Sequence, residues 1–171
     1  MQPVEIVAQV IGIIAVVVSF ITYQLKSKKS ICIVLSIAIA LFCVHYALLG
    51  ETIGVVLNVV CIIRNVCYTF ENNRILSHKA VPIVLTAIMG ILSILTWEGF
   101  HTALFASGIM INTLSLGYLK PQNLRKSLLL SCSLILIYNA VVSSWGGLIN
   151  EAFVIISAII ALIRYRNTDA A

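Results

Sequence analysis

Long apolar runs separated by short polar connections constrain this chain more than any other feature of its sequence. A bilayer core about 30 Å thick needs about 20 apolar residues to be crossed by one helix, with a working range of roughly 17–25. Seven such runs fill most of the chain. They lie at Ile6–Tyr23, Ile31–Leu49, Thr52–Phe70, Ala80–Trp97, Thr102–Leu119, Ser127–Ser144 and Gly147–Arg164. Because the runs lack the alternation of a membrane strand, they predict an all-α polytopic membrane protein with seven transmembrane helices.

The composition excludes the soluble classes of protein. Of the 171 residues, 61% are hydrophobic and only 10% are charged, whereas a soluble domain carries about 25% charged residues. A soluble enzyme, a disordered chain and a nucleic-acid-binding module are therefore excluded. The sequence also lacks a nucleophile–base pair and the usual metal-ligand motifs, so we expect no enzymatic activity, no cofactor and no metal ion. The five cysteines lie inside apolar runs, where packing is the expected role.

Basic residues indicate how the helices are oriented. Ten of the eleven lysines and arginines lie on alternate connections or in the tail after the last run. They are Lys26, Lys28, Lys29, Arg74, Lys79, Lys120, Arg125, Lys126, Arg164 and Arg166. The connections at Gly50–Glu51, Glu98–His101 and Trp145–Gly147 hold none. Since basic residues accumulate on the cytoplasmic side of a membrane, the sequence predicts an N-terminus outside and a C-terminus inside.

Small residues predict which faces of the first two helices pack closely. Ala8, Gly12, Ala15 and Ser19 share one face of the first span. Cys32, Ser36, Ala40, Cys43 and Ala47 form a similar stripe on the second span. Small side chains let helix backbones approach each other inside a membrane, so both stripes are expected to be buried.

The order of the spans indicates an internal repeat. Gln24 and Gln122 each follow a span and precede basic residues and a serine, and Tyr46 and Tyr138 begin the same Tyr-x7-Gly-x3-Asn spacing. The two glutamines are 98 residues apart and the two tyrosines 92 residues apart. Because these separations differ, either an insertion or a chance match explains the similarity. Together with the topology, the pattern predicts one membrane domain, 1–171. Within it, a first three-helix bundle (6–70), a linker helix (80–97) and a parallel second bundle (102–164) would follow one another.

Several motifs of the chain resemble known membrane protein families. They are Gln9-Val-Ile-Gly12, Ser19-Phe-Ile-Thr-Tyr-Gln24, His45-Tyr46, Leu49-Gly50, Asn58 and Arg64-Asn65. On these residues the chain resembles the YgjV-like bacterial inner membrane proteins over nearly its full length, which implies the bacterial inner (cytoplasmic) membrane as its location. More distantly, the 3+1+3 order and Pro121-Gln122 resemble the SWEET and PQ-loop proteins. That resemblance implies a hinge at Gln24, Pro121 and Gln122, although the first repeat has Tyr23 in place of the proline.

Polar residues inside the spans are the candidates for a functional site, because they are costly in a bilayer. Arg64 lies in the third span, toward the predicted cytoplasmic side. Three roles are open for it: its side chain snorkels to the interface, faces the core to bind an anionic or hydroxylated solute, or pairs with another helix.

The neutral polar residues of three spans complete the candidate site. Amides donate and accept hydrogen bonds without adding charge, which suits a sugar or another hydroxylated solute. The predicted substrate-binding residues are Asn58, Arg64, Asn65, Asn112, Tyr138 and Asn139. Alternatively, each asparagine only forms a hydrogen bond between helices. His45, near the predicted outer face, is either an interfacial residue without a role or a proton-linked switch.

Two functions remain open at this stage. The first is a small-solute transporter or facilitator, sugar-like solutes included, with a polar cavity at the bilayer midplane. The second is a non-transporting membrane scaffold or accessory subunit, in which the same residues link helices. The expected partners are the lipid bilayer, a small polar solute and, in a homo-oligomer, further copies of the chain; no nucleic-acid partner is expected.

Overall fold

A computed structural model describes residues 3–22, 25, 28–70, 73, 75–76 and 78–164. Within these ranges the chain forms seven α-helices and no strand, which confirms the predicted all-α class. The helices are α1 (Pro3–Thr22), α2 (Lys28–Leu49), α3 (Thr52–Thr69), α4 (Val81–Leu95), α5 (Phe100–Tyr118), α6 (Pro121–Val141) and α7 (Trp145–Arg164). Their bounds follow the apolar runs closely, because the length of each run sets the length of each helix.

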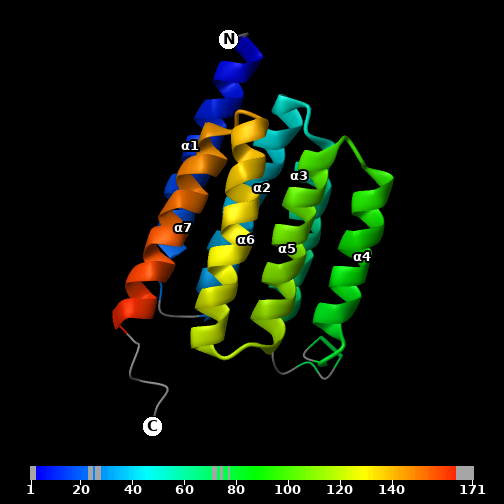
Figure 1. Ribbon diagram of the computed structural model, residues 1–171, viewed down its shortest axis with the longest axis vertical. Helices are drawn as coiled ribbons and strands as arrows, with labels where there is room; N and C mark the ends of the chain where they lie inside the picture. The colour runs from blue at the N-terminus through cyan, green and yellow to red at the C-terminus, as the bar shows by residue number, and fades with distance from the viewer. Residues whose placement is uncertain are drawn as a thin grey trace.

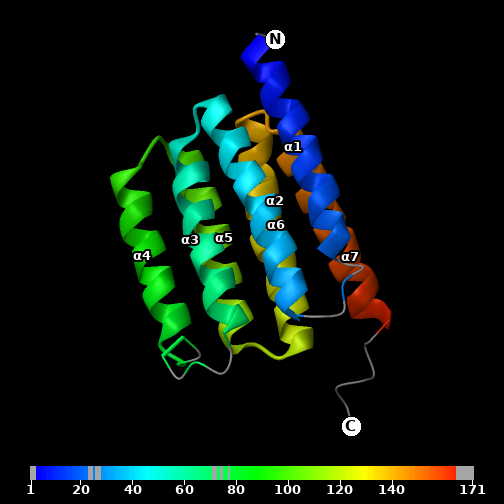
Figure 2. The same ribbon diagram turned by 180° about the vertical axis from the view of Figure 1, so that it is seen from behind.

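The helices form two layers, with α4 at one edge. In Figure 1, α7, α6 and α5 lie side by side in front, and Figure 2 shows α1, α2 and α3 side by side behind them. Contacts between neighbours join α1 to α2, α2 to α3, α5 to α6 and α6 to α7, while α1 meets α7 and α3 meets α5 across the layers. Helix α4 packs against α5 and α3. Whether the two layers are parallel repeats of one unit stays a prediction of the sequence.

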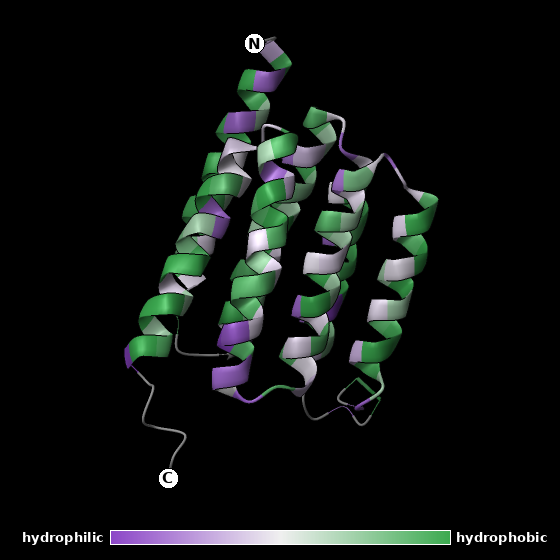
Figure 3. Ribbon diagram, in the orientation of Figure 1, coloured by the Kyte–Doolittle hydropathy of each residue, from purple (hydrophilic) through white to green (hydrophobic). Residues whose placement is uncertain are grey.

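The outer surface of the bundle is apolar. Five helices, namely α1, α2, α3, α6 and α7, are long and apolar enough to cross a membrane, and α4 is a shorter apolar helix of 15 residues. Large apolar side chains such as Val17, Ile63 and Ile156 are about half exposed on the outside of the bundle. Figure 3 shows apolar residues along most of each helix, with hydrophilic residues gathered at the lower end of α6. This surface is the one expected of a protein embedded in lipid.

Helices α2 and α6 begin earlier than their apolar runs predict, at Lys28 instead of Ile31 and at Pro121 instead of Ser127. Proline is favoured in the first helical turn, because the N–H that it lacks would have no partner there. This first turn of α6 is closed by the Leu124 N–H, which donates to the Lys120 carbonyl at 2.9 Å. Basic side chains can extend a helix beyond the apolar core, since their charged ends reach the interface.

Only one of the two predicted small-residue faces is buried. On α1, the predicted face is confirmed, with Ala8, Gly12, Ala15 and Ser19 all buried. On α2 the prediction is wrong, because Ala40 and Ala47 of its stripe are exposed. The buried face of α2 consists of Ala38, Phe42, His45 and Tyr46.

The small-residue stripe of α2 is not buried because α2 places large side chains between the layers. The glycines that make room for them lie on the neighbouring helices. A Cβ atom on Gly12 of α1 would lie 2.9 Å from the His45 ring. A Cβ atom on Gly54 of α3 would lie 2.6 Å from the Tyr46 ring. The small residues therefore make room for aromatic ones here, instead of pairing with small residues on the neighbouring helix.

Candidate functional site

Arg64 is buried inside the bundle, so the snorkelling role is wrong. Its side chain on α3 is only 4% exposed and reaches across the layers to α5. The guanidinium donates from Nη1 to the Thr113 hydroxyl at 3.1 Å, and from Nη2 and Nε to Asn65 Oδ1 at 3.2 and 3.4 Å. Both partners are neutral, and no carboxylate pairs with Arg64 among the described residues.

The surroundings of Arg64 leave further hydrogen-bonding capacity open. Three of the five guanidinium N–H groups have acceptors, which leaves two without one in the described part of the chain. The Asn65 Nδ2 and Asn112 Oδ1 atoms are buried and have no partner either. Tyr68 completes this group by donating its hydroxyl to the Thr113 carbonyl at 3.4 Å. We call Arg64, Asn65, Tyr68 and Thr113 the Arg64 group.

Asn58 lies two turns before Arg64 on α3 and is also buried. Its Nδ2 donates to the Gly54 carbonyl of the same helix at 2.7 Å. This bond is local, so Asn58 does not link helices through its Nδ2 atom.

Tyr138 and Asn139 belong to a different polar network, at the opposite end of the bundle. Both are fully buried in the last turn of α6, near the turn to α7. Asn139 Oδ1 accepts from the Tyr46 hydroxyl at 2.7 Å, and the Tyr138 hydroxyl donates to Glu51 Oε2 at 3.2 Å. These bonds join α6 to α2 and to the α2–α3 turn. We call this end of the bundle, which the basic residues predict to face outward, the Glu51 end.

The structure therefore divides the predicted substrate-binding residues into two groups. No hydrogen bond described here joins Asn139 to the Arg64 group. Between the layers lies an aromatic cluster of Phe42, Tyr46, Phe105 and Tyr138, in which the Phe105 and Tyr138 rings are 4.4 Å apart. The Asn139 Nδ2 atom is buried without a partner, and a Cβ on Gly147 would lie 2.1 Å from Asn139 Oδ1.

His45 is a core residue of the Glu51 end, so its interpretation as an interfacial histidine is wrong. It is fully buried, with Nδ1 2.7 Å from the Ala8 carbonyl and Nε2 2.7 Å from the Ser144 hydroxyl. Because a carbonyl only accepts, we assign the ring proton to Nδ1 and infer that Nε2 accepts from Ser144. Ser144 accepts in turn from the Gly147 N–H at 3.2 Å. The chain of bonds joins α1, α2 and α7.

Gln9 ties α1 to the same turn between α6 and α7. Its Nε2 donates to the Ser143 carbonyl at 2.8 Å, and its Oε1 accepts from the Trp145 N–H at 3.1 Å. Sequence reasoning did not assign a role to Gln9. Gln9 lies on the buried small-residue face of α1, one turn before Gly12. That position could have indicated a role in helix packing from the sequence.

Glu51 is the acidic member of this network. Its side chain is 18% exposed, in the turn between α2 and α3. Burial, more than any other effect, raises the pKa of Glu51 above its ordinary value, and nearby Glu98 raises it further. The Tyr138 hydrogen bond and the neighbouring His101 oppose this shift. The carboxyl is therefore easier to protonate than an exposed glutamate.

The predicted hinge residues lie at the opposite end. Pro121 and Gln122 form the first turn of α6, where the proline interrupts no helical hydrogen bond. Gln122 Oε1 accepts from Arg125 Nη1 at 3.2 Å. Gln24 lies outside the described residues, and the hinge role of all three stays a prediction.

Comparison with known proteins identifies the family but adds no relative of known structure. Neither the curated proteins nor the solved structures contain a match, so the resemblance to SWEET and PQ-loop proteins stays a prediction. The Imp-YgjV family, described as a bacterial inner membrane protein, matches residues 6–169. That range covers all seven helices apart from the first residues of α1. The chain therefore belongs to the Imp-YgjV family of bacterial inner membrane proteins.

Proposed function

We propose that this chain is not an enzyme but a transporter or facilitator that moves a small anionic or hydroxylated solute, sugar-like solutes included, across the bacterial inner membrane. One observation carries the proposal: Arg64 is a positive charge, 4% exposed, whose hydrogen-bond acceptors in the described part of the chain are neutral oxygens. An arginine near the centre of a membrane helix costs about 2.5–3.5 kcal/mol on insertion scales. Such a residue is a functional-site candidate by default, because a structural role could be filled by a neutral side chain.

The unfilled hydrogen bonds of the Arg64 group suggest the chemistry of the solute. Among the described residues, two guanidinium N–H groups and the Asn65 amide are donors without acceptors. A ligand that satisfies them must offer several oxygen acceptors, as a carboxylate, a phosphate or a polyhydroxylated solute does. Asn112 precedes Thr113 on α5, and its Oδ1 atom is an acceptor without a partner in the described part of the chain, so we assign it to a hydroxyl group of the same solute. Tyr138 and Asn139 bond to Glu51 and Tyr46 at the opposite end of the bundle, so we place the binding residues at the Arg64 group.

Uptake into proteoliposomes tests this proposal. Purified chain would be assayed with a panel of labelled monosaccharides, small carboxylates and inorganic phosphate, alongside the Arg64→Gln and Lys126→Gln variants. Hydrogen bonds to a charged group contribute about 1.5–3 kcal/mol, so Arg64→Gln should lower uptake by roughly 10–100-fold. Lys126→Gln removes an exposed basic residue at the start of α6 and should leave uptake near that of the natural chain. No uptake of any solute by well-folded protein would contradict the proposal.

Cysteine accessibility provides a second, solute-independent test. In a background without the five native cysteines, Asn58→Cys would be exposed to a membrane-impermeant thiol reagent from each side. Ile63→Cys is the matched control, because Ile63 is one turn further along α3 and half exposed on the lipid-facing surface. Labelling at 58 but not at 63 would mean that water reaches the interior of the bundle. Failure to label position 58 from either side would favour the scaffold function instead.

A further inference from the structure

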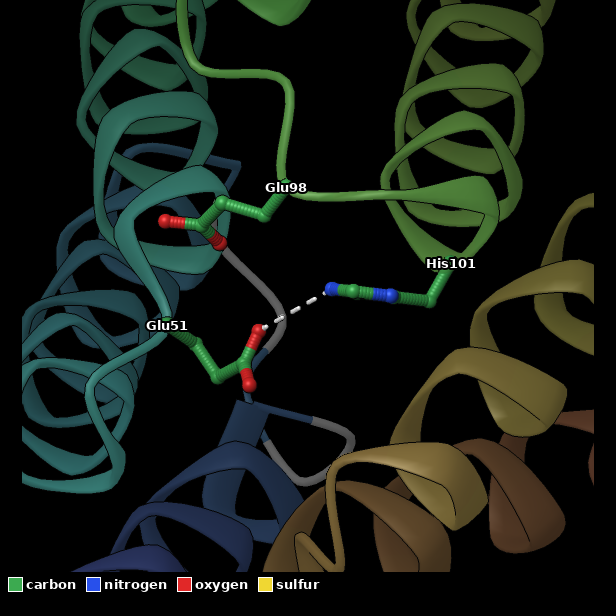
Figure 4. A group of neighbouring side chains, drawn as sticks. All are labelled: Glu51, Glu98 and His101. Carbon is green, nitrogen blue, oxygen red and sulfur yellow. Dashed lines mark ion pairs between the residues drawn. The ribbon is translucent and has the colours of Figure 1, made fainter.

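Three potential metal ligands converge at the Glu51 end, outside the Arg64 group. They are Glu51 in the α2–α3 turn, Glu98 in the α4–α5 connection and His101 in the first turn of α5. One ligand atom of each lies within 4.8 Å of the others. Figure 4 shows the three side chains directed into the space between the two connections, with His101 Nε2 facing the Glu51 carboxylate.

One ion pair joins His101 to Glu51, and no described ion pair joins Glu98 to either residue. His101 Nε2 is 3.8 Å from Glu51 Oε2, which is longer than a hydrogen bond. Two ligands of one tetrahedral metal ion at ordinary bond lengths are about 3.4 Å apart. Movements well under 1 Å would therefore bring these two atoms to the spacing of metal ligands. Glu98 is exposed, so its side chain is free to follow.

The two carboxylates at this end have one described ion-pair partner, His101, whose Nε2 atom lies 3.8 Å from Glu51 Oε2. Within the described ranges, no lysine or arginine forms an ion pair with Glu51 or Glu98. The connections at this end of the bundle contain no lysine or arginine. Two carboxylates close together repel each other, and a divalent cation between them would remove that repulsion.

The residues behind the cluster hold two of the ligands in place. The fully buried Tyr138 donates its hydroxyl to Glu51 Oε2 at 3.2 Å, and the His101 ring stacks on the Tyr138 ring with centroids 6.1 Å apart. Thr102 fixes the connection, since its hydroxyl accepts from the Glu98 N–H at 3.1 Å. Partners of this kind orient the side chains that bind a metal directly.

From this arrangement we propose that Glu51, Glu98 and His101 bind a divalent transition-metal ion, with water in the remaining position. An imidazole together with carboxylates suits Zn²⁺ and similar ions, whereas Mg²⁺ and Ca²⁺ prefer oxygen ligands alone. The proposal does not rest on solute transport, and it departs from the expectation, based on sequence motifs, that no metal is bound. A bound ion would join the α2–α3 turn to the α4–α5 connection.

Zinc binding to the detergent-purified chain, stripped of metal by a chelator, tests the proposal. We expect one Zn²⁺ per chain, competed poorly by Mg²⁺. Glu98→Gln and His101→Gln should each weaken binding at least about 10-fold, since even the loss of an outer partner of a metal ligand costs 10–100-fold. His78→Gln is the matched control, because His78 lies at the opposite end of the bundle and accepts from the Ala80 N–H. Glu98 is exposed, and its side chain makes no hydrogen bond described here, so Glu98→Gln should fold.

Zinc K-edge absorption spectroscopy distinguishes this site from the free cysteines. We expect only nitrogen and oxygen neighbours near 2.0–2.2 Å, at about the bond lengths of histidine and carboxylate ligands, and no sulfur at about 2.3 Å. The proposal would be overturned if sulfur were bound directly to the zinc ion, or if Glu98→Gln bound zinc as tightly as the natural chain. It would also be overturned if His78→Gln lost as much zinc affinity as the cluster variants. Because no solute is used, these results do not depend on whether the chain transports anything.

Discussion

Replacing Gly146 by alanine should separate α1 from α7 and destabilise the bundle. Gly146 lies at the start of α7, where an added Cβ would be 2.6 Å from the Gly12 carbonyl carbon and 2.8 Å from its Cα and O atoms. All three are backbone atoms of α1, so no side-chain rotation can relieve the overlap. Moving that contact to about 3.4 Å, where van der Waals contacts begin, requires a separation of about 0.8 Å.

The separation would also break the two hydrogen bonds of Gln9. Gln9 donates to the Ser143 carbonyl at 2.8 Å and accepts from the Trp145 N–H at 3.1 Å. If each distance grew by about 0.8 Å, both would exceed hydrogen-bonding distance. Overpacking costs about 1–3 kcal/mol, and an interhelical hydrogen bond in a membrane contributes about 0.6 kcal/mol. The higher helix propensity of alanine offsets up to about 1 kcal/mol. We therefore expect a net loss of about 1–3 kcal/mol.

The assay is reversible unfolding of the purified protein in mixed detergent micelles, followed by circular dichroism. Gly90→Ala is the matched control, because a Cβ on Gly90 would meet only Met110 Cε, at an ordinary 3.6 Å. That variant should be as stable as the natural chain or up to about 1 kcal/mol more stable. If part of the loss arises through Gln9, Gly146→Ala should cost less in a Gln9→Ala background. Equal stability of Gly146→Ala and Gly90→Ala would refute the close approach of α1 and α7.

Three further predictions concern the Glu51 end and its turn. Tyr46→Phe should lower the free energy of unfolding by about 0.6–1.5 kcal/mol, because Asn139 Oδ1 loses its buried donor; an unchanged value in the same assay would contradict this. Ser143→Gly should stabilise the chain by up to about 1 kcal/mol, because exposed Ser143 has φ 55°, a left-handed conformation that costs an L-residue about 1–2 kcal/mol. With a chelator present, stability should fall as the pH rises through the folded pKa of Glu51. Burial raises that pKa above the unfolded value, so the fold favours the neutral form, and Glu51→Gln should remove this step from the pH profile.

The fold was predictable where one physical requirement dominates. The thickness of the bilayer sets the length of each apolar run, so α3, predicted to span Thr52–Phe70, ends within one residue of that range. The start of α6 was missed by six residues, because polar residues such as Gln122 and Arg125 continue the helix beyond the apolar core. Residue composition marks the membrane-embedded part of a helix, not its full extent.

The packing of α2 was not predictable from residue size alone. The small residues Ala40 and Ala47 suggested a close-packed face, yet the chain buries His45 and Tyr46 instead. Each of these two has polar partners on other helices or turns, and such partners appear only once the layers are assembled. In a membrane, a buried polar side chain with complete hydrogen bonds can define the interior face as well as a small residue does.

The two candidate sites differed in how far sequence could locate them. Arg64 was identified as a candidate from its position in a span, but a rotation of α3 decides whether it meets lipid or α5. Glu51, Glu98 and His101 all lie on connections predicted to share one side of the membrane, so grouping residues by predicted side would have collected them. Their convergence depends on α3 packing against α5, which no local pattern in the sequence reveals.

The hydrogen bonds between the layers are distributed unevenly, and this bears on how a transporter of this fold would open. At the Glu51 end, bonds from Gln9, His45, Tyr46 and Tyr138 join the layer of α1–α3 to α6 and its turn to α7. At the Arg64 group, the hydrogen bonds between the layers that join described residues all reach Thr113. Separating the layers at the Arg64 group would break fewer hydrogen bonds than separating them at the Glu51 end. A solute that bonds to the guanidinium would replace the bonds that are lost. On the transport proposal, the structure is therefore a state closed at the Glu51 end, and a metal ion bound there would hold that end closed.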